Sequence, residues 1–151
     1  MRNMPPTART AVTVALFAIV AVASSLATLA AQRQVQRSTV FEWTGHAATP
    51  NRTGAVWQVT RTPTPTLAEL EIHVTTLNPG ESPHPPHQHP NEELLIVKEG
   101  TLETIQNGVP RRVDTGGIIF QASNDMHGIR NIGQTPATYY VIAWTVPASG
   151  K

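Results

Sequence analysis

The chain contains no cysteine, and charged residues make up only 14% of its 151 positions. Without cysteine, no disulfide can stabilise the fold, and no thiolate is present to act as a metal ligand or a nucleophile. The fold must therefore be stabilised by a hydrophobic core, which a chain of this length can bury adequately. The same length is typical of one modest domain.

An excess of positive charge is also absent. The chain has 11 Lys and Arg residues against 10 Asp and Glu residues, and its small positive charge comes from Arg2 and Arg9. From residue 32 onward, nine basic residues stand against ten acidic ones, so this part of the chain is nearly neutral. A neutral domain without a basic stripe gives no reason to expect binding of nucleic acid.

The first 31 residues differ from the rest because they contain no acidic residue. Arg2 and Arg9 precede the almost wholly apolar stretch 11–31, which ends in small residues, and this order is typical of a secretory signal peptide in helical form. An uncleaved membrane anchor is the alternative, because the 21 residues of this stretch can just span a bilayer. We therefore predict an extracytoplasmic protein, periplasmic or secreted, that contacts a membrane only through 11–31 if cleavage does not occur. Since no Arg-Arg pair for the twin-arginine route is present, we expect export before folding.

Beyond residue 31, short strand-like segments alternate with turns, and neither a helical pattern nor an internal repeat is present. Residues 32–66 are expected to form a lead-in and the first strands, at 39–44 and 55–61. Later strands are predicted at 67–77, 92–100, 101–108 (with Asn107-Gly108 as its hairpin turn), 118–124, 126–133 and 135–146. Many short strands with regularly spaced turns predict an all-β sandwich or barrel.

The predicted strand 67–77 has one apolar and one polar face, because its residues alternate with a period of two. Glu71 and His73 share the polar face with Thr75. If this face lines the interior of the domain, His73 and Glu71 are candidates to orient a metal ligand or to line a pocket. A position on the surface is the alternative.

The predicted strand 135–146 is apolar on both faces. We expect Tyr140, Ile142 and Trp144, which share one face, to lie in the core. Tyr139 projects from the opposite face and is a further candidate for a pocket.

Histidine is rare, yet three of the six histidines lie within "HPPHQHPNEE", residues 84–93. The prolines of this stretch exclude a helix, since each would cost about 3 kcal/mol in a helix interior. In an extended chain, residues two apart project to the same side, so His87 and His89 can point at one spot, and Glu93 can join them. Two imidazoles and a carboxylate indicate a site for a divalent transition metal. A solvated histidine-rich loop is the alternative from this stretch alone.

The segment around these residues resembles the cupin superfamily over about residues 67–146. The first cupin motif consists of a glycine, H-x-H, a glutamate and a second glycine, and it corresponds here to Gly80, His87, His89, Glu93 and Gly100. Six residues separate the first glycine from the first histidine, where the motif usually has five.

The second cupin motif is similar to residues 117–131, which contain Gly117, His127 and Asn131. The P-x-G turn of the motif is replaced by Ala122-Ser123-Asn124. Because asparagine adopts the left-handed backbone conformation more readily than most non-glycine residues, we expect Asn124 to take the place of the glycine.

This resemblance implies a double-stranded β-helix, or jelly-roll, barrel with a metal held inside one end. It implies one divalent transition metal ion (Zn, Cu, Fe, Mn or Ni) with four ligands, His87, His89, Glu93 and His127. His84 is expected at the rim of the site. The resemblance also implies a homodimer, to which the strand expected at 39–44 could contribute by crossing to a partner.

The function is less determined than the fold, because cupins support many activities. One class is a metal-dependent enzyme of the dioxygenase, isomerase or lyase type that acts on a small oxygenated organic compound. The other class is a non-catalytic, metal-containing protein that binds a small, sugar-like molecule. We favour the enzyme, for which His73, Glu71 or Tyr139 could supply a general base. An enclosed pocket lined by such groups would favour the enzyme over the binding protein.

Overall fold

Nine β-strands and no helix occur in the part of the chain that the computed structural model describes, residues 35–44 and 47–148. The all-β class predicted from the strand pattern is thus confirmed. The predicted signal helix within residues 1–31 lies outside the described residues. Within the described ranges, no helix has the length and apolar composition needed to cross a membrane.

Apart from β6, which was not predicted, the strands follow the predicted pattern from residue 54 onward. Their bounds are β1 (Thr49–Asn51), β2 (Gly54–Thr62), β3 (Glu69–Leu77), β4 (Glu92–Glu99), β5 (Thr101–Gln106), β6 (Val109–Asp114), β7 (Ile118–Gln121), β8 (His127–Asn131) and β9 (Ala137–Thr145). The predicted turn between β5 and β6 is confirmed, because Asn107 and Gly108 both have positive φ values, 48° and 83°.

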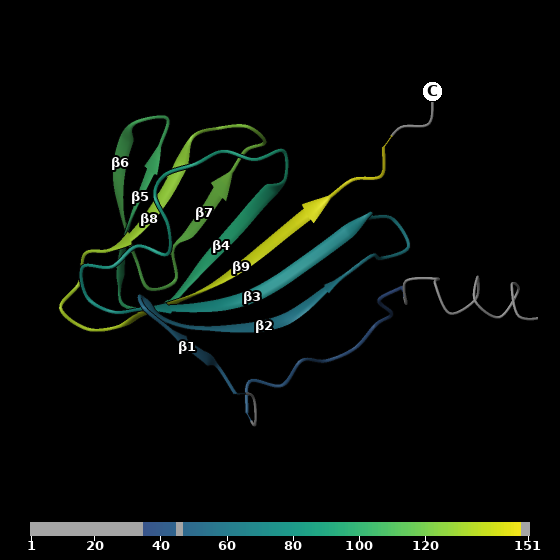
Figure 1. Cartoon of the computed structure of the whole chain (residues 1–151), viewed down its shortest axis with the longest axis horizontal. Helices are drawn as coiled ribbons and strands as arrows, with labels where there is room; N and C mark the ends of the chain where they lie inside the picture. The colour runs from purple at the N-terminus through teal and green to yellow at the C-terminus, as the bar shows by residue number, and fades with distance from the viewer. Residues whose placement is uncertain (1–34, 45–46, 149–151) are drawn as a thin grey trace, which may run out of the picture. The chain divides into compact units, whose positions relative to one another are not determined.

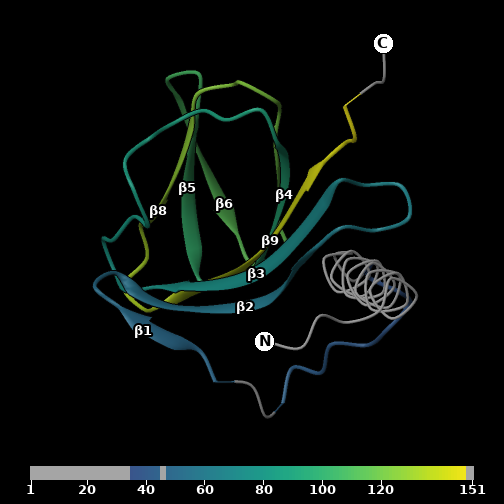
Figure 2. The same ribbon diagram turned by 45° about the vertical axis from the view of Figure 1, so that its right-hand side comes forward.

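The strands form two sheets. The larger sheet has the order β1-β2-β3-β9-β4-β7, and the smaller sheet has the order β6-β5-β8. The smaller sheet lies across from the long strands β3 and β9 (Figures 1 and 2), and all the neighbouring pairs are antiparallel. The buried core between the sheets comprises Leu77, Leu95, Val97, Leu102, Ile119, Ile129, Ala137, Tyr139 and Val141.

From the sequence, the wrong face of β9 was predicted to lie in the core. Tyr139, Val141 and Ala143 are buried between the sheets, whereas Tyr140 and Ile142 project from the other face and are half-buried. The alternation of β9 is correct, but both of its faces are apolar, so polarity alone could not show which one points inward. As a result Tyr139, predicted as a pocket residue, lies inside the barrel.

The predicted strand at 39–44 is absent, and this segment has no regular structure. Trp43 instead packs edge-on against Trp57 of β2 and Tyr140 of β9, with ring centroids 5.8 and 5.9 Å apart. The aromatic residue that suggested a strand, Trp43, therefore packs against the chain's own larger sheet. This removes the strand that was expected to cross to a partner. The homodimer stays a prediction, for which light scattering at micromolar concentration is the measurement.

Two glycines at the ends of β5 give a matched pair of substitutions. Gly100 has a φ of +84°, and a Cβ atom there would lie 2.7 Å from the Cβ of Ala137. Gly108 has nearly the same φ, +83°, but a Cβ atom there has no neighbour within 4 Å. We expect Gly108→Ala to cost roughly 1–2 kcal/mol for the left-handed conformation alone. Gly100→Ala should cost clearly more, because the added methyl group also collides with β9.

Urea unfolding followed by circular dichroism measures both costs. Equal destabilisation of the two variants would show that the contact of Gly100 with Ala137 relaxes freely, contrary to this expectation.

Candidate metal centre

The histidines of the two motifs come from segments about 40 residues apart and are joined by backbone hydrogen bonds. His87 lies in the loop between β3 and β4, and His127 is the first residue of β8. The amide of His87 donates to the carbonyl of His127 at 2.9 Å, and the amide of His127 donates to the carbonyl of His87 at 2.8 Å. This pair of bonds fixes the spacing of the two residues regardless of what their side chains bind.

The turn before His127 is joined to the same loop. Asn124 has a φ of 61°, which confirms that it adopts the left-handed conformation expected of the motif's glycine. Its amide donates to the carbonyl of His89 at 2.8 Å. The departure of this turn from the usual motif therefore leaves its geometry intact.

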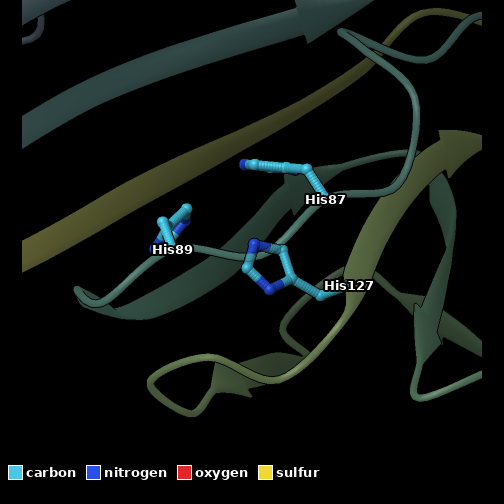
Figure 3. Close-up of side chains that lie close together, drawn as sticks. All are labelled: His87, His89 and His127. Atoms are coloured by element: carbon cyan, nitrogen blue, oxygen red, sulfur yellow. The ribbon is translucent and has the colours of Figure 1, made fainter.

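The imidazoles of His87, His89 and His127 lie close together (Figure 3), with ring centroids 4.7 to 5.1 Å apart. Each ring offers one nitrogen, and these three nitrogens all lie within 4.8 Å of one another. His127 is buried, and the other two are half-buried. Three imidazole nitrogens at this spacing suit a divalent transition metal such as zinc, copper, iron or nickel.

Hydrogen bonds determine which nitrogen two of these rings present. The Nδ1 of His127 lies 2.8 Å from the carbonyl oxygen of Asp125, and the Nδ1 of His89 lies 3.0 Å from that of Asn91. A carbonyl can only accept, so both Nδ1 atoms must carry a proton, and Nε2 is the nitrogen that each ring can offer to a metal. The Nε2 of His127 is buried and has no hydrogen-bond partner. A buried acceptor without a partner fits a position that a metal ion fills.

His87 is held in the neutral form. Burial, followed by the neighbouring imidazoles of His84, His127 and His89, lowers its pKa from 6.5 to about 4. Its Nδ1 is also buried and without a hydrogen-bond partner. Because only neutral imidazole binds a metal, His87 is ready to act as a ligand at neutral pH.

Glu93, the predicted fourth ligand, lies beside this group rather than inside it. It is the second residue of β4, and its Oε1 lies 3.2 Å from the Nε2 of His89. The three-histidine group does not include it, so its role as a ligand stays a prediction. His84 is exposed, as expected for the rim, and its ring packs edge-on against that of His87.

A cavity of about 490 Å³ opens beside the three histidines. His87, His127 and Glu93 line it, together with residues of both sheets and of the β1–β2 turn. Its other polar lining residues are Asn51, Arg52, Thr53, His73, Thr75, His84, Gln121 and Tyr139. The polar face predicted for β3 thus lines the interior, and the alternative of a surface position for His73 is excluded.

Tyr139 contributes a neutral hydroxyl to this cavity. Burial raises its pKa far above the usual value, the negative charge of Glu93 raises it further, and a hydrogen bond with Thr75 opposes the rise. The phenol therefore stays protonated at any physiological pH. It is suited to hydrogen bonding and cannot serve as a base there.

Gln121 is a pocket residue that the sequence interpretation missed. Its side chain is 1% exposed, and on β7 it lies directly opposite Glu93 of β4. Its amide contacts the Oγ of Thr104 at 3.5 Å and the Nε2 of Gln106 at 3.4 Å. The signal was present in the sequence, because Gln121 shares its strand face with the apolar Ile119 and so projects into the core.

Comparison with known proteins agrees with this fold. Residues 73–143 match the family model of the cupin domain. The cupin domain of Cnp3 from Schizosaccharomyces pombe is similar with a TM-score of 0.61 and 15% identity, over 72% of this chain and 75% of that chain. KdgF from Halomonas sp. gives 0.59 and 19% identity, over 71% and 94%. An RmlC-like cupin from Shewanella frigidimarina gives 0.57 and 16%, over 74% and 96%.

At these identities the structural matches show the fold and no shared activity. No curated protein sequence gives a significant match. The chain is thus similar to the cupin domain over residues 73–143, and its fold is shared with these solved structures. The described residues thus combine a fold similar to that of cupins with three closely spaced histidines beside an interior cavity.

Proposed function

We propose that this protein is an exported, metal-dependent enzyme that acts on a small oxygenated organic compound inside the barrel. One observation carries the proposal: of three histidines suited to a metal, His87 and His127 line a cavity that also holds further ionisable side chains. His87, His89 and His127 would hold one divalent transition metal ion, with Glu93 as a fourth ligand. The bound ion would supply a Lewis acid for a substrate oxygen.

The residues of the chain supply binding and orientation. The cavity volume of about 490 Å³ lies within the range of small-molecule sites, roughly 300–1,000 Å³. The hydroxyls of Tyr139 and Thr75 and the amide of Gln121 can form hydrogen bonds with a polar ligand, while Leu95 and Val141 provide apolar walls. This mixture suits a compact molecule with several oxygen atoms.

The alternative function is a non-catalytic, metal-containing protein that binds a sugar-like molecule. The two functions are distinguished by incubating metal-loaded protein with a panel of small hydroxy, oxo and carboxylic compounds and recording their NMR spectra. New product signals that are missing with His89→Ala protein support the enzyme. Broadening of ligand signals without any product would contradict it and favour the binding protein.

We predict export from the pattern of residues 1–31. If the protein is exported, the identity of its bound metal should depend on the cellular compartment. A chain exported unfolded has no preformed site, so it acquires its metal outside the cytoplasm. Affinity at nitrogen and oxygen ligands rises from manganese through iron to copper, with zinc below copper. Protein recovered after export should therefore carry mostly zinc or copper. Protein expressed in the cytoplasm without residues 1–31 should carry more iron, manganese or nickel.

Elemental analysis of the two preparations measures this difference. The same metals in the same proportions would show that the site alone selects its ion, and that the compartment plays no part.

A further inference from the structure

His73 and Glu71 project from β3 into the barrel, although neither belongs to the three-histidine group. In the six-stranded sheet, Glu71 lies opposite Ala143 of β9, and Ala143 lies opposite Glu93 of β4. Residues paired in this way share one face of the sheet, so Glu71, His73 and Glu93 all face the interior. Ala143, which has a small side chain, lies between the two carboxylates in the register. Figure 2 shows β3, β9 and β4 side by side around that interior.

The imidazole of His73 is placed beside a carboxylate. Its Nδ1 lies 3.2 Å from the Oε1 of Glu71. This Nδ1 is buried, and Glu71 lies within ion-pair distance of it without being aligned for a hydrogen bond. Because the ring has two nitrogens and Nδ1 faces Glu71, Nε2 is the nitrogen left for the cavity that His73 lines.

The carboxylate of Glu71 is itself held from its other side. Its Oε2 lies 3.6 Å from an Nη of Arg61, and Arg61 also pairs with Glu69 at 3.1 Å. Arg61 is opposite Glu71 in the β2–β3 register, and His73 lies two residues further along β3 on the same face. The contacts Arg61–Glu71–His73 thus lead from the surface to an imidazole in the cavity.

We propose that His73 is the proton-transferring residue of the cavity, that Glu71 is its positioning residue, and that the substrate is a small carbonyl compound with a C–H bond next to the carbonyl. The proposal rests on the proposed enzymatic function and narrows it to proton transfer. It favours an isomerase or lyase over a dioxygenase, because every step below takes place without an oxidant.

In the proposed reaction, His73 carries the proton that is removed from the C–H bond. The lone pair of Nε2 takes the proton of the C–H bond, the electron pair of that bond forms a carbon–carbon double bond, and the carbonyl π electrons move to oxygen. The imidazolium formed is stabilised by the adjacent carboxylate of Glu71. In an α-hydroxy substrate, Nε2–H then returns the proton to the neighbouring carbon while the α-hydroxyl proton moves to the alkoxide oxygen, which completes an isomerisation. Alternatively, Nε2–H protonates a departing β-hydroxyl group while the carbonyl re-forms, which releases water.

The role of Glu71 is tested by ¹⁵N NMR of the histidine side chains in the full chain, first without metal and then loaded with zinc. We expect neutral His73 to carry its proton on Nδ1. Glu71→Ala should lose this preference, whereas Glu71→Gln, whose amide oxygen can still accept, should keep it. Glu69→Ala is the matched control, because it removes the neighbouring carboxylate that does not contact His73. The same tautomer in all four proteins would overturn the positioning role.

The role of His73 is tested by hydrogen–deuterium exchange in D₂O, with dihydroxyacetone and pyruvate as probes and zinc-loaded full-length protein. General acid–base catalysis contributes about 10²–10⁴-fold, so His73→Gln should slow the exchange by at least about 100-fold. Elemental analysis should show that this variant keeps its zinc, and Glu69→Ala should exchange the probes at the wild-type rate.

Two results would overturn the inference while leaving the metal site in place. One is a zinc-loaded wild-type protein that exchanges neither probe faster than His89→Ala protein. The other is a His73→Gln variant that exchanges the probes at the wild-type rate. A wild-type chain that binds no metal would instead refute the proposed function itself.

Discussion

His89→Ala protein is expected to lose stoichiometric metal binding. His89 presents Nε2 to the metal centre while its Nδ1–H is held by the carbonyl of Asn91 at 3.0 Å. Alanine removes this ligand and leaves two of the three grouped imidazoles. Loss of a group that merely supports a ligand costs about 10–100-fold in metal affinity, so loss of a ligand itself should cost more.

The measurement is elemental analysis after dialysis, supported by calorimetric titration with zinc. His84→Ala is the matched control, because His84 is an exposed histidine three residues before His87. It should keep the full metal content. Retention of one metal per chain by His89→Ala protein would contradict the assignment of the centre.

Asn131→Ala is expected to lower the free energy of unfolding strongly, although Asn131 is not one of the proposed metal ligands. Asn131 is completely buried, and its Nδ2 donates to the carbonyls of Leu77 and Thr135, both at 2.9 Å. Its Oδ1 accepts from the amide of Gly133, also at 2.9 Å. Alanine leaves three backbone groups without partners. At about 1 kcal/mol for each bond, the free energy of unfolding should fall by about 3 kcal/mol or more.

Urea unfolding followed by circular dichroism gives this free energy. Asn78→Ala is the control, because Asn78 is exposed, and such a surface change should stay within about 0.5 kcal/mol of the wild type. A loss of less than about 1 kcal/mol in Asn131→Ala would show that water or a shifted backbone satisfies the three groups.

The parts of the site that the sequence predicted well are those fixed by local chemistry. Prolines around His87 and His89 force an extended loop, and an extended loop presents alternate residues to one side. The left-handed conformation of Asn124 followed from the intrinsic preference of asparagine, and its φ of 61° agrees. Neither inference required knowledge of distant contacts.

The parts that could not be predicted depend on which surface another strand covers. Tyr139 and Tyr140 are both aromatic residues of β9, and only the position of the second sheet decides that Tyr139 is inside. Trp43 is aromatic and was read as part of a strand, but its partners Trp57 and Tyr140 are distant in sequence. The strand β6 was not predicted, because Pro110 and the two arginines that follow it do not fit the usual residue pattern of a strand. An edge strand tolerates proline, and this strand is almost wholly exposed.

The exact position of the Glu93 carboxylate is another feature that the sequence could not predict. Even spacing correctly placed it on the side of His87 and His89. Spacing alone does not determine whether its carboxylate lies among the imidazoles or against one of them, and in the structure it lies 3.2 Å from the Nε2 of His89. That distinction depends on side-chain rotamers, which a sequence pattern does not encode.

The paired backbone hydrogen bonds between His87 and His127 have a consequence for the order of assembly. In zinc fingers the ion is required for folding, and the chain is unfolded without it. Here backbone hydrogen bonds join the segments of His87 and His127, and a separate hydrophobic core lies between the two sheets. We therefore expect a metal bound at the three histidines to add to the stability of this fold by mass action, according to its free concentration. On this expectation the folded protein does not require the ion to stay folded, so removal of the metal with a chelator should leave the far-UV circular dichroism spectrum unchanged.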